Sequence, residues 1–482
     1  MWNDPSIGRV AFGKNYTEWE SLRCSELDYW VTVGETPKEI LKYYTEVTGR
    51  APKFPENMLG LWQCKLRYRT QEEVLEVARE YHRRGLPLDV IIIDFFHWKH
   101  MGDWSFDPTY WPDPAAMVRE LHEMGTRCMV SIWPTVEPSS INYRALKERG
   151  LLVKSVRGGI SGMTMLGQQA TFYDPTNPKA REFVWSKCAE NYYKDGINCF
   201  WLDVAEPEYM PADFEHYVYH AGSAEKTACL FPLNYAKTFY DGMCAAGQTD
   251  IVNLLRCAWV GSQRYAAAVW SGDIRSNFET LRAQLSAGLN IGIAGIPWWT
   301  TDTGGFTGDI REPFFNELLI RWFQFSTFCP ILRMHGDHGP RDIPRLSDTI
   351  HSGGYCHTGQ PHELWSYGEE VYAILKSYLD IRLSMKDYLA GLMDEASQNG
   401  SPLMRTMFYE FPNDPVCWEL DDQYMLGDRY LVAPVMYEGM RERAVYLPSG
   451  QWKDIHTGTV YKGGQRLTVS APLEIIPVFE RI

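Results

Sequence analysis

Residues 88–95 read LDVIIIDF, and this stretch decides the fold. It is apolar on both faces, without alternation of apolar and polar side chains, as expected for a parallel strand that is covered on both sides. Short β-rich apolar runs recur along the chain, at 58–63, 127–133, 199–203, 251–255, 267–270 and 291–297. The sequence therefore predicts a series of buried parallel strands.

The stretches between these runs carry the signals that begin and end helices. Thr70 is followed three residues later by a glutamate, which is the spacing of a capping box. Asp113-Pro114 combines a capping side chain with a proline at the first helical position, and Asn177 is followed by a proline in the same way. Repeated strand–helix units over 51–412 favour a closed (β/α)₈ TIM barrel over an open sheet.

The two ends of the chain read differently from this central region. Residues 413–482 contain short, turn-separated runs typical of a small antiparallel β-sandwich. Residues 1–50 contain a candidate strand at 27–34 (LDYWVTVG) and a predicted helix at 37–50. A segment of this length is too short to form an independent domain with its own core.

Charge and cysteine usage restrict the class of protein. The chain has 482 residues, with 47 Lys and Arg against 61 Asp and Glu, for a net charge of −14. An acidic chain without a basic block is a poor candidate for binding nucleic acid or an anionic membrane, and no apolar run approaches the length of a membrane span. The 11 cysteines are scattered, without a C-x-x-C pair, and the N-terminus MWNDPSIGRV lacks a signal-peptide pattern. We therefore expect reduced thiols and a cytoplasmic protein.

The sequence does not indicate a cofactor. No predicted strand is followed by G-x-G-x-x-G or by a phosphate-binding G-x-x-x-x-G-K-[ST] loop. His97 and His100 form a histidine pair without a third ligand, which favours a structural role over a metal site. We expect neither an organic cofactor nor a metal.

Several polar and aromatic residues follow the apolar runs directly. In a TIM barrel the active site lies at the C-terminal ends of the strands. The residues at those positions are Asp94, Trp133, Asp203, Glu206, Arg256, Asp273, Asp302, Arg333 and His335. Two carboxylates that flank a bond are the minimum apparatus for glycoside hydrolysis. An aspartate after a strand is more often a helix cap or turn former, so these residues alone support a barrel hydrolase and little more.

Longer motifs around these residues resemble a known family. FWLDVAEPE (200–208), VWSGD (269–273), PWWTTDTGGF (297–306), ILRMHG (331–336) and IIIDFFHWKHMGDWSFDPTYWPDP (91–114) occur in one chain. Together they resemble glycoside hydrolase family 31, the retaining α-glycosidases. The resemblance extends from about Ala51 to the C-terminus, and the motifs occur in the order and at separations compatible with the family.

The resemblance implies specific roles. Asp203 lies at the position of the catalytic nucleophile and Asp273 at that of the acid/base, with their carboxyl groups expected about 5–5.5 Å apart. The implied substrate-binding residues are Asp94, Phe95, Trp133, Arg256, Trp270, Asp302 and His335. The family requires no metal or organic cofactor.

The segments DFFHW, SIWPTV, EPE and GSQRY look most like the α-xylosidases of the family. Phe95 and Phe96 are bulky where the hydroxymethyl group of a hexose would otherwise fit, so a pentose is expected, as a terminal α-xylosyl residue of an oligosaccharide. An α-glucosidase or an α-galactosidase of the same family stays open. So does a non-catalytic carbohydrate-binding barrel, although such a protein need not retain both Asp203 and Asp273.

One departure from the family pattern concerns the region ahead of the barrel. The family carries a large β-sandwich there, which contributes a loop to the rim of the active site. Residues 1–50 hold only a remnant of that sandwich. We expect an exposed apolar flank on the barrel, and with it a homo-oligomer or weakened substrate binding.

Overall fold

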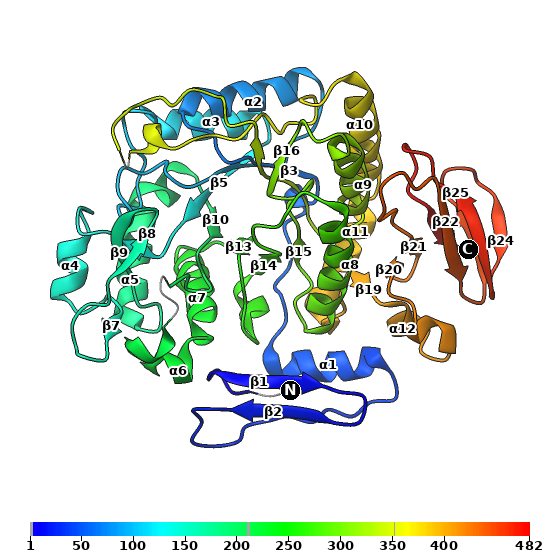
Figure 1. The fold of residues 1–482 in the computed structure, drawn as a ribbon, viewed down its shortest axis with the longest axis horizontal. Coiled ribbons are helices and arrows are strands. Elements are labelled where there is room, and N and C mark those ends of the chain that lie inside the picture. The colour runs from blue at the N-terminus through cyan, green and yellow to red at the C-terminus, as the bar shows by residue number, and fades with distance from the viewer. Residues whose placement is uncertain (1–2, 210–212, 351) are drawn as a thin grey trace.

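The structure is a computed structural model that describes residues 3–209, 213–350 and 352–482. Its centre is a sheet of eight parallel strands in the order β15-β14-β13-β10-β5-β4-β3-β17 (Figure 1). These strands are β3 (Leu61–Gln63), β4 (Val90–Ile93), β5 (Arg127–Ile132), β10 (Cys199–Leu202), β13 (Asn253–Leu255), β14 (Ala267–Trp270), β15 (Trp299–Thr300) and β17 (Leu332–Met334). The two edge strands meet, because the amide of Ile331 donates to the carbonyl of Trp299 at 3.2 Å. The predicted TIM barrel is confirmed.

One strand predicted within the barrel region is wrong. The apolar run at 291–297 forms the end of helix α8 (Phe278–Ile293) and the turn after it, and β15 begins only at Trp299. Gly295 adopts φ +90°, a left-handed conformation that glycine accepts at the end of a helix. A short apolar run by itself does not distinguish a buried strand from the buried side of a helix.

Helices cover the outside of the barrel. The longer ones are α2 (Gln71–Arg83), α3 (Pro114–Glu123), α5 (Pro178–Asn191), α7 (Leu230–Ala245), α8, α9 (Phe315–Thr327), α10 (Glu369–Ser384) and α11 (Lys386–Asn399). The predicted caps are present: Thr70, Asp113 and Asn177 each accept a hydrogen bond from a backbone amide of the first turn that follows. Each cap satisfies one of the amides that a helix start leaves without an intrahelical partner.

Smaller elements extend the loops. Three small sheets are formed by β6 (Thr135–Val136), β8 (Met163–Met165) and β9 (Gln168–Phe172), by β7 (Lys154–Ser155), β11 (Tyr217–Tyr219) and β12 (Gly222–Ser223), and by β16 (Thr307–Asp309) and β18 (Asp337–Gly339). Short helices are α4 (Tyr143–Glu148), α6 (Ala224–Thr227) and α12 (Met407–Glu410). No helix among the described residues is long and apolar enough to cross a membrane.

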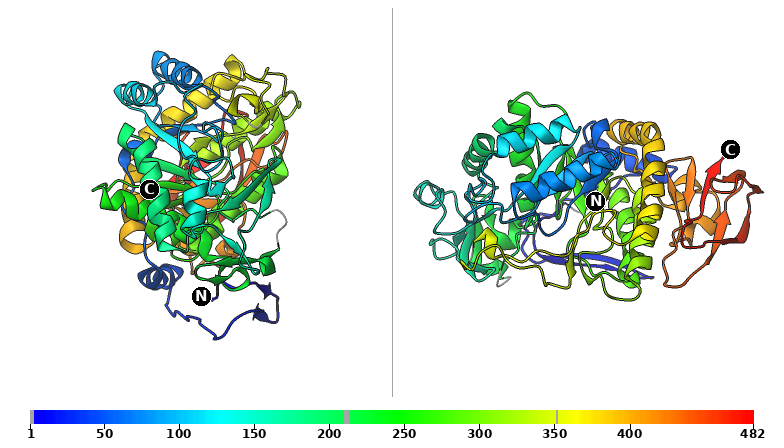
Figure 2. Two further views of the ribbon diagram at one scale, coloured as in Figure 1. Left: turned by 90° about the vertical axis from the view of Figure 1, so that its left-hand side faces the viewer. Right: turned by 90° about the horizontal axis from the view of Figure 1, so that it is seen from above.

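The C-terminal part forms a separate antiparallel layer beyond α9 and α10 (Figures 1 and 2). Its larger sheet has the order β19-β20-β21-β26-β23-β24, and β22 pairs with β25. The strands are β19 (Met404–Arg405), β20 (Tyr424–Leu426), β21 (Tyr430–Val432), β22 (Glu442–Leu447), β23 (Gln451–Asp454), β24 (Val460–Lys462), β25 (Gln465–Ser470) and β26 (Val478–Arg481). Arg321 on α9 joins this layer to the barrel, since its guanidinium donates to the carbonyls of Ala471 and Ile475, each at 2.8 Å.

The N-terminal segment is a hairpin of β1 (Gly8–Phe12) and β2 (Thr17–Ser21), followed by helix α1 (Pro37–Thr48) (Figure 1). The helix predicted at 37–50 is confirmed, whereas the strand predicted at 27–34 is wrong. Those residues form no regular strand, and Val31 and Val33 are 75% and 80% exposed. The stretch has suitable residues for a strand, but only an isolated bridge residue within it pairs with another segment.

Candidate active site

The predicted site residues gather at the carboxyl edge of the barrel. Asp94, Trp133, Asp203, Arg256 and His335 are each the first residue after a barrel strand, and Trp270 is the last residue of β14. Phe95, Asp273 and Asp302 follow within three residues of their strands. Because all eight strands are parallel, their carboxyl ends open on the same side of the barrel.

Asp203 is buried and held by two donors. The indole Nε1 of Trp133 donates to its Oδ2 at 3.1 Å, and the amide of Val204 donates to its Oδ1 at 2.8 Å. Val204 has φ +54°, an uncommon conformation for a β-branched residue. Strained backbone of this kind is concentrated at functional sites, where surrounding structure holds it.

Arg256 lies between the two carboxylates that the sequence assigns to catalysis. Its Nη1 is 3.6 Å from Oδ1 of Asp203 and 3.3 Å from Oδ2 of Asp273. Its Nε is 2.5 Å from Oε1 of Glu206. One guanidinium group therefore faces three carboxyl groups, and a single nitrogen of it lies near both Asp203 and Asp273.

Burial governs the protonation of these carboxyl groups. It raises the pKa of Asp203 to about 7, with Arg256 opposing the rise and Asp273 adding to it. Burial also raises the pKa of Asp273, against the opposing charges of Arg256 and Arg333. A site of this kind can keep one carboxyl group protonated near neutral pH, which a general acid needs.

The floor of the site contains a buried ion pair between Arg333 and Asp302. Burial raises the pKa of Asp302 to about 7, and the charge of Arg333 opposes that rise. Several buried polar atoms here have no protein partner among the described residues: Oδ2 of Asp302, Nε and Nη2 of Arg333, Nδ1 of His335 and Nε1 of Trp270. Buried polar atoms are nearly always hydrogen-bonded, so this group indicates a place for a polar ligand.

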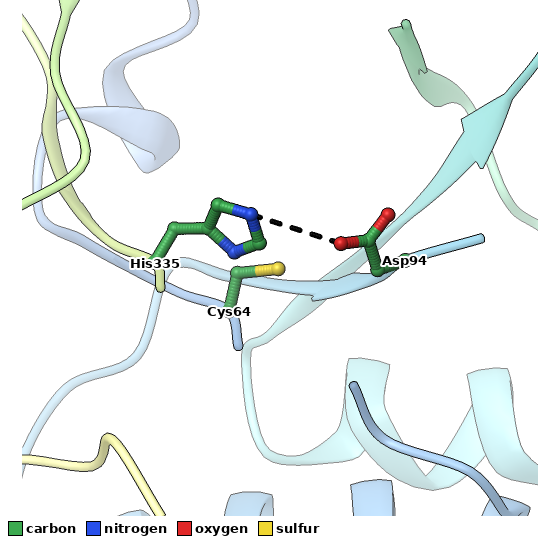
Figure 3. Close-up of side chains that lie close together, drawn as sticks. All are labelled: Cys64, Asp94 and His335. Carbon is green, nitrogen blue, oxygen red and sulfur yellow. Dashed lines mark ion pairs between the residues drawn. The ribbon is translucent and has the colours of Figure 1, made fainter. Parts of the chain in front are cut away.

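Asp94, His335 and Cys64 form a second cluster in the site (Figure 3). Nε2 of His335 lies 3.7 Å from Oδ2 of Asp94. Burial raises the pKa of the Asp94 carboxyl and of the Cys64 thiol, and it lowers the pKa of His335. Within the described ranges these three are the one set of side chains with spacing for a metal ion. Because a cysteine binds a metal ion as its thiolate, the raised pKa of the Cys64 thiol disfavours a metal here, and the cluster suits hydrogen bonds with a polar ligand better.

An aromatic wall closes one side of the site. The rings of Phe95 and Trp133 are stacked with centroids 4.4 Å apart, and Phe96 lies 5.2 Å from Phe95. Phe96 has φ +58°, which no local sequence pattern predicts. The wall is therefore built from neighbouring strands, β4 and β5, and ends at the indole that binds Asp203.

Some site residues were not assigned a role from the sequence. Glu206 follows β10 and Arg333 lies within β17, and the sequence assigns no function to either; it does not indicate Cys64 or Arg67. Cys64 directly follows β3, so the rule that located the other residues also applies to it. Arg67 carries no such signal, because it lies in the loop after that strand.

The barrel, the two carboxyl groups beside Arg256 and the buried polar floor together define a glycosidase-type barrel. The family model described as the Glycosyl hydrolases family 31 TIM-barrel domain matches residues 51–392, and that of the family 31 C-terminal domain matches residues 400–482. The chain belongs to glycoside hydrolase family 31.

Individual relatives agree with this family. An "Uncharacterized family 31 glucosidase ORF2" from Pseudescherichia vulneris is 55% identical over 342 residues, covering 71% of this chain and 64% of the relative. An "Alpha-xylosidase" from Saccharolobus solfataricus is 34% identical over 496 residues, covering 100% of this chain and 62% of the relative. The chain therefore spans less than two thirds of the length of these two proteins.

A solved structure described as a GH31 alpha-xylosidase from a soil metagenome, complexed with xylose, is 54% identical in sequence. It superimposes with a TM-score of 0.97, and the match covers 100% of this chain and 71% of that chain. The fold described above is thus shared along the whole of the present chain.

Proposed function

We propose that the protein is a retaining α-glycosidase that removes terminal non-reducing α-linked sugars from oligosaccharides, with α-xylosyl residues as its preferred substrate. The observation that carries the proposal is the pairing of Asp203, which is buried, with Asp273, which is partly open to solvent, beside the same guanidinium nitrogen of Arg256. Two neighbouring carboxyl groups can supply both the nucleophile and the proton donor of a double displacement.

In the first step the carboxylate of Asp203 forms a bond to the anomeric carbon while the glycosidic bond breaks. The proton of Asp273 goes to the departing oxygen, so the leaving group departs as an alcohol. Trp133 and the amide of Val204 hold the attacking carboxylate in place through their hydrogen bonds.

In the second step Asp273 takes a proton from water, and the water oxygen attacks the anomeric carbon. The ester bond to Asp203 breaks, and the sugar leaves with its original configuration. Formation of the ester removes the charge of Asp203, and like-charge repulsion between the two groups is mutual. The pKa of Asp273 therefore falls when it must act as a base.

The choice of a pentose is supported by the wall of Phe95 and Phe96 and by the alpha-xylosidase relatives. The 55% identity to a protein named a family 31 glucosidase favours an α-glucosidase as the second candidate. A hydroxymethyl group that is excluded only by packing changes selectivity by about 1–3 kcal/mol, so a minor α-glucosidase activity is compatible with the proposal.

The decisive experiment measures kcat/KM on matched aryl α-xyloside, α-glucoside and α-galactoside, with Asp203→Ala as the control. We expect the wild type to prefer the α-xyloside and Asp203→Ala to lose turnover. We also expect NMR to show the α-anomer as the first product. Preference for another sugar would refute the interpretation of the aromatic wall but keep the mechanism. Absence of turnover on all three would favour a non-catalytic carbohydrate-binding barrel.

The compartment and the assembly state are also proposals. All 11 cysteines are free, which supports a reducing compartment such as the cytoplasm. The exposed apolar side chains of the N-terminal segment support self-association, and they give no support for a nucleic-acid or membrane partner.

A further inference from the structure

Phe95 is enclosed between two flat groups. The guanidinium carbon of Arg67 lies 4.1 Å from the centroid of the Phe95 ring, and the Trp133 ring lies 4.4 Å from it at an interplanar angle of 30°. A group that meets the edge of a benzene ring stays about 5 Å from its centroid, so both partners lie over a face. One face has room for one such group. Arg67 and Trp133 therefore cover opposite faces, and these two groups leave only the edge of the Phe95 ring free.

Arg67 is itself held in place. It is buried, its Nη1 donates to the carbonyl of Phe95 at 2.6 Å, and its Nε donates to the carbonyl of His357 at 2.9 Å. Its amide donates to Oγ1 of Thr358 at 3.1 Å. The side chain thus connects the loop after β3, the loop after β4 and the segment around residue 357. It contacts both the backbone carbonyl and the ring of Phe95.

The contacts continue to the reacting group. Arg67 stacks on Phe95, Phe95 stacks on Trp133, and Trp133 donates a hydrogen bond to Asp203 at 3.1 Å. Each member comes from the loop after a different strand, β3, β4, β5 and β10, and these strands are neighbours in the barrel sheet. These four residues therefore form a continuous row of contacts along one side of the carboxyl edge of the barrel.

We infer that Arg67 is a positioning residue that selects a pentose over a hexose by holding the edge of Phe95 in place. This inference rests on the proposed function. A ring that is free on one face can rotate aside and admit a hydroxymethyl group. A ring covered on both faces cannot rotate in this way, because rotation would break the stack with Trp133 and would leave the Arg67 guanidinium without its aromatic partner.

The test compares kcat/KM for aryl α-xyloside and aryl α-glucoside in Arg67→Lys and Arg67→Met. Lysine keeps the charge but loses the planar fork, and methionine keeps only the apolar stem. We expect the xyloside-to-glucoside ratio to fall about tenfold in both, mainly through a lower KM for the glucoside, since discrimination of one carbon by a packed pocket is about 10- to 200-fold. The ratio does not depend on the fraction of folded enzyme, because both substrates are measured on one preparation.

Arg321→Lys is the matched control. Arg321 is another buried arginine that donates to backbone carbonyls, but it lies between α9 and the C-terminal layer. We expect Arg321→Lys to lower the yield or Tm and to leave the ratio unchanged. In a Phe95→Ala background, Arg67→Lys should have no further effect on the ratio.

The outcomes separate the inference from the function on which it rests. A wild-type protein without α-xyloside preference would refute the proposed substrate. A wild-type preference that persists in both Arg67 variants would overturn the role of Arg67 alone. An equal fall of the ratio in Arg321→Lys would also overturn it, because loosening of the fold would then explain the change.

Discussion

The chemistry of the site depends on a few residues whose charges act on one another. Arg256 faces Asp203, Asp273 and Glu206, and burial raises the pKa of all three carboxyl groups. Protonation of the pair is thus set by competition between burial, which favours the neutral acid, and the guanidinium, which favours the carboxylate. Two predictions follow from this competition at the level of single residues.

The first concerns the pH dependence of kcat/KM. Asp203 must be ionised to attack, so activity rises as pH increases through its pKa, which is about 7 in the substrate-free protein. The acidic limb should therefore lie well above the ordinary aspartate value of 3.8. Asp273 must be protonated, so activity falls at higher pH. Asp273→Ala, assayed on an aryl glycoside with a good leaving group, should lose the alkaline limb; an unchanged limb would assign it to another residue.

The second concerns stability. Because the pKa of Asp203 is raised in the folded state, ionisation of this group lowers the free energy of unfolding. This loss of stability is absent below pH 3.8 and complete above about pH 7. Asp203→Asn keeps the shape and removes the charge. We expect it to be more stable than the wild type by ~1–3 kcal/mol at pH 7.5 and by less at pH 5. Thermal unfolding at the two pH values checks this; a gain that is larger at pH 5 would contradict it.

At the level of elements, Arg321 carries the contact between a barrel helix and the C-terminal layer. Its guanidinium donates to the carbonyls of Met440, Ala471 and Ile475, at 3.2, 2.8 and 2.8 Å. These carbonyls are in the loops of the C-terminal layer, so one side chain on α9 satisfies acceptors that the strands leave open.

Arg321→Ala should therefore destabilise the protein by ~2–4 kcal/mol, because it leaves buried carbonyls without donors. The measurement is the shift in Tm, with Arg282→Ala as a comparison on the neighbouring helix α8, where one carbonyl contact to Met436 and the stacking on Tyr437 are lost. Equal Tm shifts for the two variants would contradict this prediction, because the contacts of Arg321 would then stabilise the protein no more than those of Arg282.

At the level of the whole molecule, the N-terminal segment exposes several large apolar side chains. Phe12, Trp19 and Val31 are 75%, 46% and 75% exposed, and Phe12 and Trp19 form an edge-to-face pair at 5.8 Å on the hairpin. Exposed apolar side chains that gather on one segment indicate a contact site.

We expect the chain to self-associate in a concentration-dependent way. Replacing Phe12, Trp19 and Val31 together by serine should shift sedimentation toward the monomer. Matched serine substitutions at Tyr437 and Val460, which are also exposed but lie in the C-terminal layer, should leave the distribution unchanged. A wild-type chain that stays monomeric at all accessible concentrations would contradict the proposal.

The barrel and most of its site could be predicted from the sequence because they follow from local rules. Runs such as 88–95 are apolar on both faces, which is typical of a parallel strand covered by helices, and Thr70, Asp113 and Asn177 mark where helices begin. Parallel strands then place every residue that follows them on one edge. The two errors, at 27–34 and 291–297, occur where a short apolar stretch meets either no partner strand or the buried side of a helix.

The sequence by itself thus determined the fold and the identity of the residues at the carboxyl edge. Only the tertiary structure decided which of them touch: Arg256 between Asp203 and Asp273, and Arg67 across Phe95 from Trp133. These contacts join loops that are distant in the chain, and the loops adopt backbone conformations, as at Phe96 and Val204, that no local pattern predicts. Side-chain direction depends on those conformations, so the contacts exist only once the barrel has closed.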